Sequence, residues 1–218
     1  FIDSFATQLK EYVCKKYNLN FNKMMNDPAY KELHRDKLIK DSNDLRMEQP
    51  FIWFDALAEK YKNKNIDLVF IISSDYPRQG KDTAALALQG HSTRIISTGR
   101  NRSINVLIVP DLRYHNEIDG FKIRLSKYFK RVVHIHVTTN LETLFHRVGT
   151  HEGLYKTLKL RFDRSERELT VATCDPDYLI SNNKSKEVYN DLLYAVWSHE
   201  FTQTLKMIDS LPVKKVKK

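Results

Sequence analysis

The sequence predicts an α/β fold, a three-layer sandwich in which helices cover both faces of a mostly parallel sheet of about five strands. Three observations support this. Residues 1–62 have helical periodicity, short apolar runs alternate with polar or helical stretches from residue 66, and one long helical segment spans 185–211. Nearly continuous apolar runs separated by helices are typical of strands buried on both faces of a parallel sheet.

The helical region, residues 1–62, carries clear helix signals. Phe5, Leu9, Val13 and Tyr17 are four residues apart and share one helix face. In the stretch 26–39, Asp27 is a suitable N-cap and Pro28 suits the first helical position. A further helix starts after Pro50.

Five apolar runs are the predicted strands, at 67–72, 93–97, 105–110, 131–137 and 178–180. Helical stretches at 115–129 and 140–149 lie between them. The whole chain of 218 residues then forms a single domain. It divides into the helical region, a core at 66–140, a lid at 141–170, and a last strand with a closing helix at 171–218.

The composition limits the classes of partner. Lys and Arg number 36 against 27 Asp and Glu, a net charge of +9. An ordinary basic surface, a site for an anionic small molecule, and a nucleic-acid surface all fit this excess. Because no arginine–glycine or aromatic–basic repeat occurs, nucleic acid is the weakest of the three. No apolar run reaches the ~20 residues of a membrane span.

Cys14 and Cys174 are isolated and lack metal-ligand spacing, which indicates buried thiols in a reducing, intracellular compartment. The chain begins at Phe1, so we expect a processed product. The compartment is then the cytoplasm, or an organelle matrix if a targeting peptide was removed.

A candidate phosphate-binding loop follows the first predicted strand. Gly80, Lys81, Asp82 and Thr83 open a helix there, and backbone N–H groups at a helix start bind phosphate oxygens. Lys81 would contact the terminal phosphates of ATP, and Asp82 or Thr83 would hold Mg²⁺. The alternative is a polar turn in which Asp82 caps the helix.

The first half of this loop departs from the usual spacing. Asp75 stands where a glycine is expected, and Pro77 lacks a backbone N–H donor. A carboxylate near a triphosphate repels it unless Mg²⁺ intervenes or the side chain turns away. The sequence therefore predicts a remodelled loop with weak nucleotide affinity.

Asp111 and Arg113 directly follow the predicted strand 105–110. They are two residues apart, so an extended backbone places them on one side. The arginine would clamp a phosphate with both nitrogens, while the aspartate would orient it or bind hydrated Mg²⁺. The alternative is a structural ion pair at a strand end.

Two further groups of residues fit a phosphate site. Asn182 and Asn183 end the last predicted strand, where they would contact an adenine or form a tight turn. Arg161, Arg164 and Arg167 recur every third residue, which on a helix gives a basic stripe on a lid or a solvated face.

The helical region supplies more cations, namely Lys10, Lys31, Arg35 and Arg46. Lys31 and Arg35 are four apart and share a helix face. Such a cluster suits an anionic, phosphate-bearing small-molecule substrate, although exposed helix charge is the ordinary explanation for any one of them. His134 and His136 lie on a predicted strand and are expected to be structural.

The sequence resembles a known family at several places. Residues 5–54 resemble the helical substrate region of animal-type phosphomevalonate kinases. Residues 78–88 and 106–121 resemble both those enzymes and the phage-type deoxynucleoside monophosphate kinases, and 165–183 is similar to the end of their lid and their last core strand. Together these cover about two-thirds of the chain. The most specific parts are Tyr30-Lys31-Glu32 with Arg35, and Asp111-x-Arg113 with Glu117.

The order of the segments differs from that family. There, the phosphate loop precedes the segment that corresponds to residues 5–54, whereas here it follows that segment. Residues 93–97 look like the strand that ordinarily leads into it. This predicts a swapped order, as in a circular permutation, which a sheet tolerates when the ends lie close together.

The resemblance implies an ATP- and Mg²⁺-dependent phosphotransferase of the P-loop kinase class. Its acceptor would be phosphomevalonate, preferred over a deoxynucleoside monophosphate. Lys81, Asp111 and Arg113 would be catalytic, and Arg161 and Arg164 would bind the transferring group. Gly80 to Thr83 and Asn182 would bind ATP, and Lys10, Lys31, Arg35 and Arg46 the acceptor phosphate. The alternative is a catalytically inactive kinase-like subunit or binding module of a larger assembly.

Overall fold

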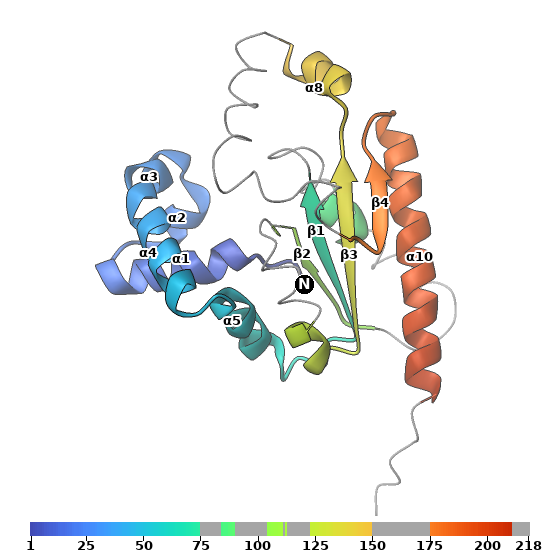
Figure 1. Ribbon diagram of the computed structural model, residues 1–218, viewed down its shortest axis with the longest axis horizontal. Coiled ribbons are helices and arrows are strands. Elements are labelled where there is room, and N and C mark those ends of the chain that lie inside the picture. Colours follow the sequence, from blue (N-terminus) through green and yellow to red (C-terminus); the bar gives the residue numbers. More distant parts are fainter. Residues whose placement is uncertain (75–83, 90–103, 111, 113–122, 150–174, 211–218) are drawn as a thin grey trace, which may run out of the picture.

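The computed structural model describes residues 1–74, 84–89, 104–110, 112, 123–149 and 175–210. It is an α/β fold around an all-parallel sheet, as predicted (Figure 1). The described residues form four strands in the order β2-β1-β3-β4. These are β1 (Leu68–Ser74), β2 (Val106–Val109), β3 (Arg131–Thr138) and β4 (Tyr178–Ser181). The fifth predicted strand, 93–97, lies outside the described residues.

β1 is the central strand, because it pairs with β2 on one side and with β3 on the other. Leu68 is in register with both Val106 and Arg131. At the other edge of β2, Ile2 forms a parallel bridge with Ile108, and the Asp3 N–H donates to the Ile108 carbonyl at 3.0 Å. The residues that lead into the first helix therefore extend the sheet beside β2.

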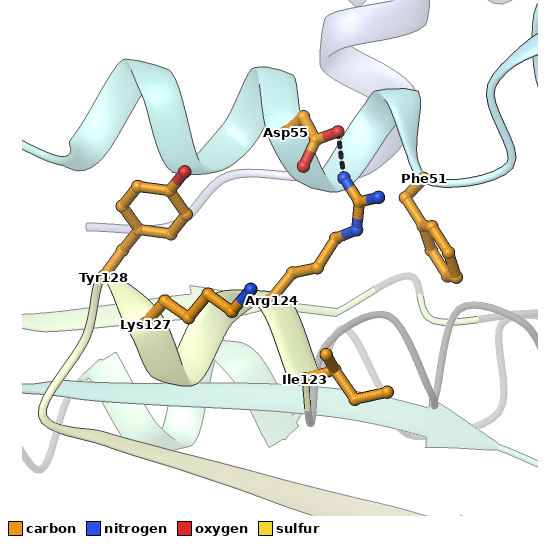
Figure 2. Close-up of a pocket in the computed structure, with 6 residues that line it drawn as sticks. All are labelled: Phe51, Asp55, Ile123, Arg124, Lys127 and Tyr128. Carbon is orange, nitrogen blue, oxygen red and sulfur yellow. Dashed lines mark hydrogen bonds and ion pairs between the residues drawn. The ribbon is translucent and has the colours of Figure 1, made fainter.

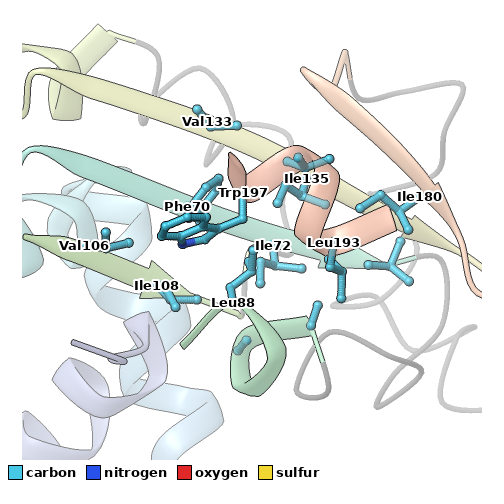
Figure 3. Close-up of a cluster of buried hydrophobic side chains, with 14 of the residues drawn as sticks. Phe70, Ile72, Leu88, Val106, Ile108, Val133, Ile135, Ile180, Leu193 and Trp197 are labelled. Carbon is cyan, nitrogen blue, oxygen red and sulfur yellow. The ribbon is translucent and has the colours of Figure 1, made fainter. Parts of the chain in front are cut away.

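Strand alternation gives the sheet two apolar faces. One face carries Phe70 of β1, which packs with Trp197 and Leu193 of the long helix α10 (Lys186–Ser210) (Figure 3). Helical residues 84–89 add Leu88 to this core. α10 matches the closing helix predicted at 185–211. Apart from Glu200 and Thr204, its buried residues are large and mainly apolar, so it fixes one outer layer of the sandwich.

The opposite face is covered by the helical region. Val69 and Ile71 of β1 pack there with Phe54 and Leu57 of α5 (Ile52–Tyr61) and with Phe5 of α1 (Phe5–Tyr17). The 3₁₀ turn η2 (Leu125–Lys127), within the predicted helical stretch 115–129, adds the buried Leu125. This face and the α10 face together complete the three layers.

The helix signals in the helical region are confirmed. Asp27 caps α3 (Pro28–Leu33) by accepting from the Ala29 and Tyr30 N–H groups, and Pro28 is its first residue. α2 (Phe21–Asn26) precedes it. The stretch 26–39 is not one helix, however, because His34 leaves helical geometry and α4 (Arg35–Glu48) begins after it.

The outer end of the helical region has a small core of its own. Val13 and Cys14 of α1 pack there with Met24 of α2 and Leu38 of α4. Burial raises the pKa of the Cys14 thiol, which agrees with the expected buried thiol. No described strand residue belongs to this small core, so the contacts among α1, α2 and α4 hold this end of the region together.

Beyond β3 the chain forms α8 (Leu141–Val148), within the predicted stretch 140–149. The Asn140 side chain caps its start by accepting from the Thr143 N–H at 2.8 Å. Gly149 ends it with a φ of 71°, a left-handed conformation that favours glycine. Within the described part of the chain, no helix is long and apolar enough to cross a membrane.

Candidate functional site

The candidate site lies at the carboxyl edge of the sheet, which we define as the edge where the strands end. The chain runs from β1 to β2 on one side and then returns to β3 on the other side of β1. The chain leaves β1 toward β2 at one edge of the sheet and leaves β3 toward β4 at the other edge. The two connections therefore run in opposite directions. In open parallel sheets, ligands bind outside the strand ends at such a switch point. The predicted phosphate loop starts directly after Ser74, the last residue of β1.

The end of β1 is polar on the side that faces the helical region. The Ser73 hydroxyl lies 2.7 Å from His134 Nε2 and 2.7 Å from His136 Nδ1, both on β3. All three side chains have 0% exposure. The histidines are on a strand and buried, as the structural interpretation predicts. They connect β1 to β3 just before the switch point.

The end of β3, the turn after it and α8 are fixed to the end of β4 by four hydrogen bonds. The Asn182 N–H donates to the Thr138 carbonyl at 2.8 Å, and the Asn140 N–H donates to Asn183 Oδ1 at 2.7 Å. Arg147 Nη2 of α8 donates to the Asn182 carbonyl at 2.6 Å and reaches its Oδ1 at 3.2 Å. β3, α8 and β4 therefore meet in one braced corner at the carboxyl edge.

Asn182 sits in this corner with 9% exposure, and its side-chain oxygen accepts from Arg147. Residues 183–184 bend directly after it, which agrees with the predicted turn. A role of Asn182 toward adenine stays a prediction. If it holds, the amide nitrogen of the side chain is the donor that would act, because the oxygen is engaged.

Thr139 is a polar residue of the same corner that sequence patterns do not reveal. It has 4% exposure, and its hydroxyl has no hydrogen-bond partner among the described residues. It follows β3 directly, between Thr138 and the cap residue Asn140. A buried hydroxyl at a strand end of the switch point is available to a ligand atom or a water molecule.

The four predicted cations of the helical region lie on three helices. Lys10 is on α1 and contacts the Met25 sulfur at 3.6 Å. Lys31 is on α3, whereas Arg35 begins α4, so the prediction that they share one helix face is wrong. Arg35 forms an exposed ion pair with Glu32 at 3.2 Å. Arg46, near the end of α4, is half-buried. Figure 1 shows the end of the region with α2 and α3 projecting toward the level of the strand ends.

An ion pair between the exposed Lys16 and the buried Asp41 orders this part of the molecule. Asp41 of α4 has 1% exposure, and its Oδ1 accepts from Lys16 Nζ at 2.9 Å and from the Tyr17 hydroxyl at 3.2 Å. The hydrogen bond to Asp41 raises the pKa of Lys16. α1 and α4, which carry Lys10, Arg35 and Arg46, are thus locked to each other.

Several predicted site residues lie outside the described residues, so their roles stay predictions. They comprise the phosphate loop, the pair after β2 and the basic stripe of the lid, that is Asp75, Pro77, Gly80, Lys81, Asp82, Thr83, Asp111, Arg113, Arg161, Arg164 and Arg167. Cys174 and Glu117 also lie outside. Within the described ranges, no group of three or more His, Cys, Asp or Glu side chains could hold a metal ion.

A hollow of about 360 Å³ lies between α5 and η2 (Figure 2). It is lined by Phe51, Asp55, Ile123, Arg124, Lys127 and Tyr128. Arg124 forms an ion pair with Asp55, and its guanidinium lies 4.5 Å from the centre of the Phe51 ring. α5 precedes β1 and η2 precedes β3, so this hollow lies at the opposite, amino edge of the sheet. It is separate from the candidate site.

Comparison with known protein families gives one match. Residues 2–88 match the family model described as phosphomevalonate kinase. The matched part includes the helical region, β1 and the first residues of the helix after the predicted phosphate loop. No curated protein sequence matches the chain significantly. The first 88 residues are therefore similar to phosphomevalonate kinases in both the helical region and the central strand.

Proposed function

We propose that the chain is an ATP-dependent kinase that transfers a phosphoryl group to the phosphate of phosphomevalonate. The observation that carries the proposal is the match of residues 2–88 to the phosphomevalonate kinase family. Because the match includes the cation-bearing helices, it favours phosphomevalonate over a deoxynucleoside monophosphate as the acceptor.

The sheet topology supports the same proposal. The switch point between β1 and β3 is the expected ligand position of a parallel sheet, and the segment after β1 contains Gly80 and Lys81. Among the described residues at the switch point, Ser73 and Thr139 are neutral, and the charged Arg147 is engaged with Asn182. The charged groups that phosphate transfer needs would then come from the segments that follow β1 and β2.

In this proposal the chain acts by positioning and by neutralising charge. Lys81 would contact the ATP phosphates, and Arg113 with Arg161 and Arg164 would contact the transferring phosphoryl group. Asp111 would orient Arg113. Lys10, Lys31, Arg35 and Arg46 would bind the acceptor phosphate. Asp82 or Thr83 would hold Mg²⁺, which supplies charge neutralisation between the phosphates when bound.

The proposal is tested by measuring ADP release from ATP and Mg²⁺ with phosphomevalonate, and separately with deoxynucleoside monophosphates. We expect turnover with phosphomevalonate, its loss in Lys81→Ala, and an unchanged melting temperature in that variant. Lys64→Ala, which removes an exposed lysine far from the carboxyl edge, is the matched control and should keep full activity. Absence of turnover in the wild type, or equal turnover in Lys81→Ala, would contradict the proposal.

A further inference from the structure

Ser73, His134 and His136 form a polar cluster inside an otherwise apolar layer of the sheet. Going back from Ser73 along the same face of β1, the residues are Ile71 and Val69, both fully buried. On β3 the residue before His134 on this face is Val132, which packs against the same core. On β1 this layer is apolar up to Ile71 and becomes polar at Ser73, whereas on β3 it becomes polar at His134, which is paired with Ile71.

The cluster is not what core packing alone would require. Buried polar groups lose their bonds to water and must find partners inside the protein, whereas apolar side chains of similar size fill the same space without this constraint. Departures from simple core rules are expected at functional sites. The end of β1 at the switch point is where such a departure would serve a ligand.

The hydrogen bonds also restrict Ser73 itself. A serine hydroxyl has one hydrogen to donate and two lone pairs to accept with. One ring nitrogen of each histidine lies 2.7 Å from the hydroxyl, so the hydroxyl can accept from a ring N–H on one side and donate to a ring nitrogen without hydrogen on the other. The tautomers of His134 and His136 are then coupled, and the Ser73 side chain is held in one orientation between them.

The same bonds fix the backbone at the place where β1 and β3 separate. Ser73 is directly paired with His136, and Ser74 with Val137, in the last two positions of this ladder. Groups that contact reacting phosphates must be held within about 0.5 Å of their productive positions by a rigid supporting structure. The cluster provides that rigidity one residue before the chain leaves the sheet.

We propose that Ser73 is a positioning residue for nucleotide binding, held in place by His134 and His136. The cluster does not touch ATP. It fixes the carboxyl end of β1, from which the phosphate-binding segment starts. This inference rests on the proposed function, because it assumes that ATP binds at the switch point.

The test compares four proteins, namely wild type, Ser73→Ala, Ser73→Thr and Ile71→Val. Ser73→Ala removes the hydroxyl, and Ser73→Thr keeps it on a residue that strands accept well. Ile71→Val is the matched control, since it weakens the same face of β1 two residues earlier without changing a polar group. Melting temperature, ATP affinity by calorimetry, and the KM for ATP and for the acceptor are measured for each.

We expect Ser73→Ala to weaken ATP binding about tenfold and to raise the KM for ATP by a similar factor, with little change in the KM for the acceptor. Ser73→Thr should restore most of the affinity. Ile71→Val should lower the melting temperature while keeping the ATP affinity of the wild type. Amide hydrogen exchange at Ser73 and Ser74, measured without ATP, should be faster in Ser73→Ala than in Ile71→Val.

The outcomes separate this inference from the proposed function. If the wild type binds ATP and Ser73→Ala binds it equally well, the positioning role is wrong and the kinase proposal stands. If Ile71→Val loses as much ATP affinity as Ser73→Ala, the effect is general loosening of β1, and the positioning role is again wrong. If the wild type binds no ATP, both proposals fail.

Discussion

Arg131, the first residue of β3, is held by Glu200 of α10 through two guanidinium nitrogens, Nε and Nη2. The Tyr178 hydroxyl of β4 donates to the same carboxylate at 2.5 Å. Glu200 has 1% exposure, so the carboxylate depends on these donors. One buried side chain of α10 thereby joins two neighbouring strands of the sheet.

Arg131→Met should lower the free energy of unfolding by about 3 kcal/mol, because removing one partner of a buried ion pair leaves a charge without compensation. Urea unfolding at pH 7 measures the change. Lys62→Met is the control, since it removes an exposed ion pair with Glu59 and should cost less than about 0.5 kcal/mol. Equal losses in the two variants would contradict the role given to Glu200.

Glu200 also predicts a dependence of stability on pH. Burial alone would raise the pKa of its carboxyl, but the hydrogen bonds from Arg131 and Tyr178 outweigh burial and lower the pKa overall. The folded-state value then lies below the unfolded value of about 4.3. Glu200 therefore stabilises the fold above that pH, and this contribution is lost as the pH falls through the folded-state pKa.

The check is a comparison of wild type with Glu200→Gln by urea unfolding at several pH values. The difference in unfolding free energy should be largest near pH 7 and should shrink below about pH 4. A difference that stays constant between pH 7 and pH 3.5 would mean that ionisation of Glu200 does not contribute to stability.

Asp75→Gly should strengthen ATP binding, by about fivefold if the carboxylate faces the phosphates, since one repulsive charge is worth about 1 kcal/mol in solvent-exposed surroundings. Titration calorimetry of ATP with Mg²⁺ into both proteins measures the change. Glycine also permits close backbone approach to a phosphate. Unchanged ATP affinity in the variant, or low-micromolar ATP affinity in the wild type, would show that Asp75 does not weaken nucleotide binding.

Replacing Lys31 and Arg35 with alanine, singly, should raise the KM for the acceptor about tenfold and leave the KM for ATP unchanged. Each removes a cation from the helices that resemble the acceptor-binding region. Lys40→Ala, on an exposed position of α4, is the matched control and should leave both constants unchanged. A rise in the KM for ATP instead would assign these cations to the nucleotide.

Most of the fold could be predicted from sequence because its signals are local. The runs that form β1, β2, β3 and β4 are apolar and β-branched, and the Asp27-Pro28 pair marks the start of α3 without any tertiary information. The break at His34 could not be predicted, because the residues on both sides of it are compatible with one continuous helix. In the structure the break lies between Tyr30 of α3 and Leu38 of α4, which pack in the same small core with α1 and α2.

The candidate site was harder to predict than the fold, because its described contacts join distant segments. The proximity of Ser73 to His134 and His136 depends on strand order and register, which no single stretch encodes. Arg147 binding to Asn182 depends on how α8 leaves β3. The available sequence signal is a polar residue, Ser73, at the end of an apolar strand. It marks the position of the site but does not show that His134 and His136 are the hydrogen-bond partners.

The central place of β1 has a kinetic consequence. Its neighbours come from far along the chain, and Ser73 and His136, which face each other in the ladder, are separated by 63 residues. Each of these pairings requires closure of a long loop before any contact forms, and such topologies fold slowly. Substitutions in β1 should therefore affect the folding rate more strongly than equally destabilising substitutions in α2 or α3, whose contacts are local. A slowly folding chain exposes unpaired strands for longer, so the yield of native protein should depend on how quickly β1 finds β2 and β3.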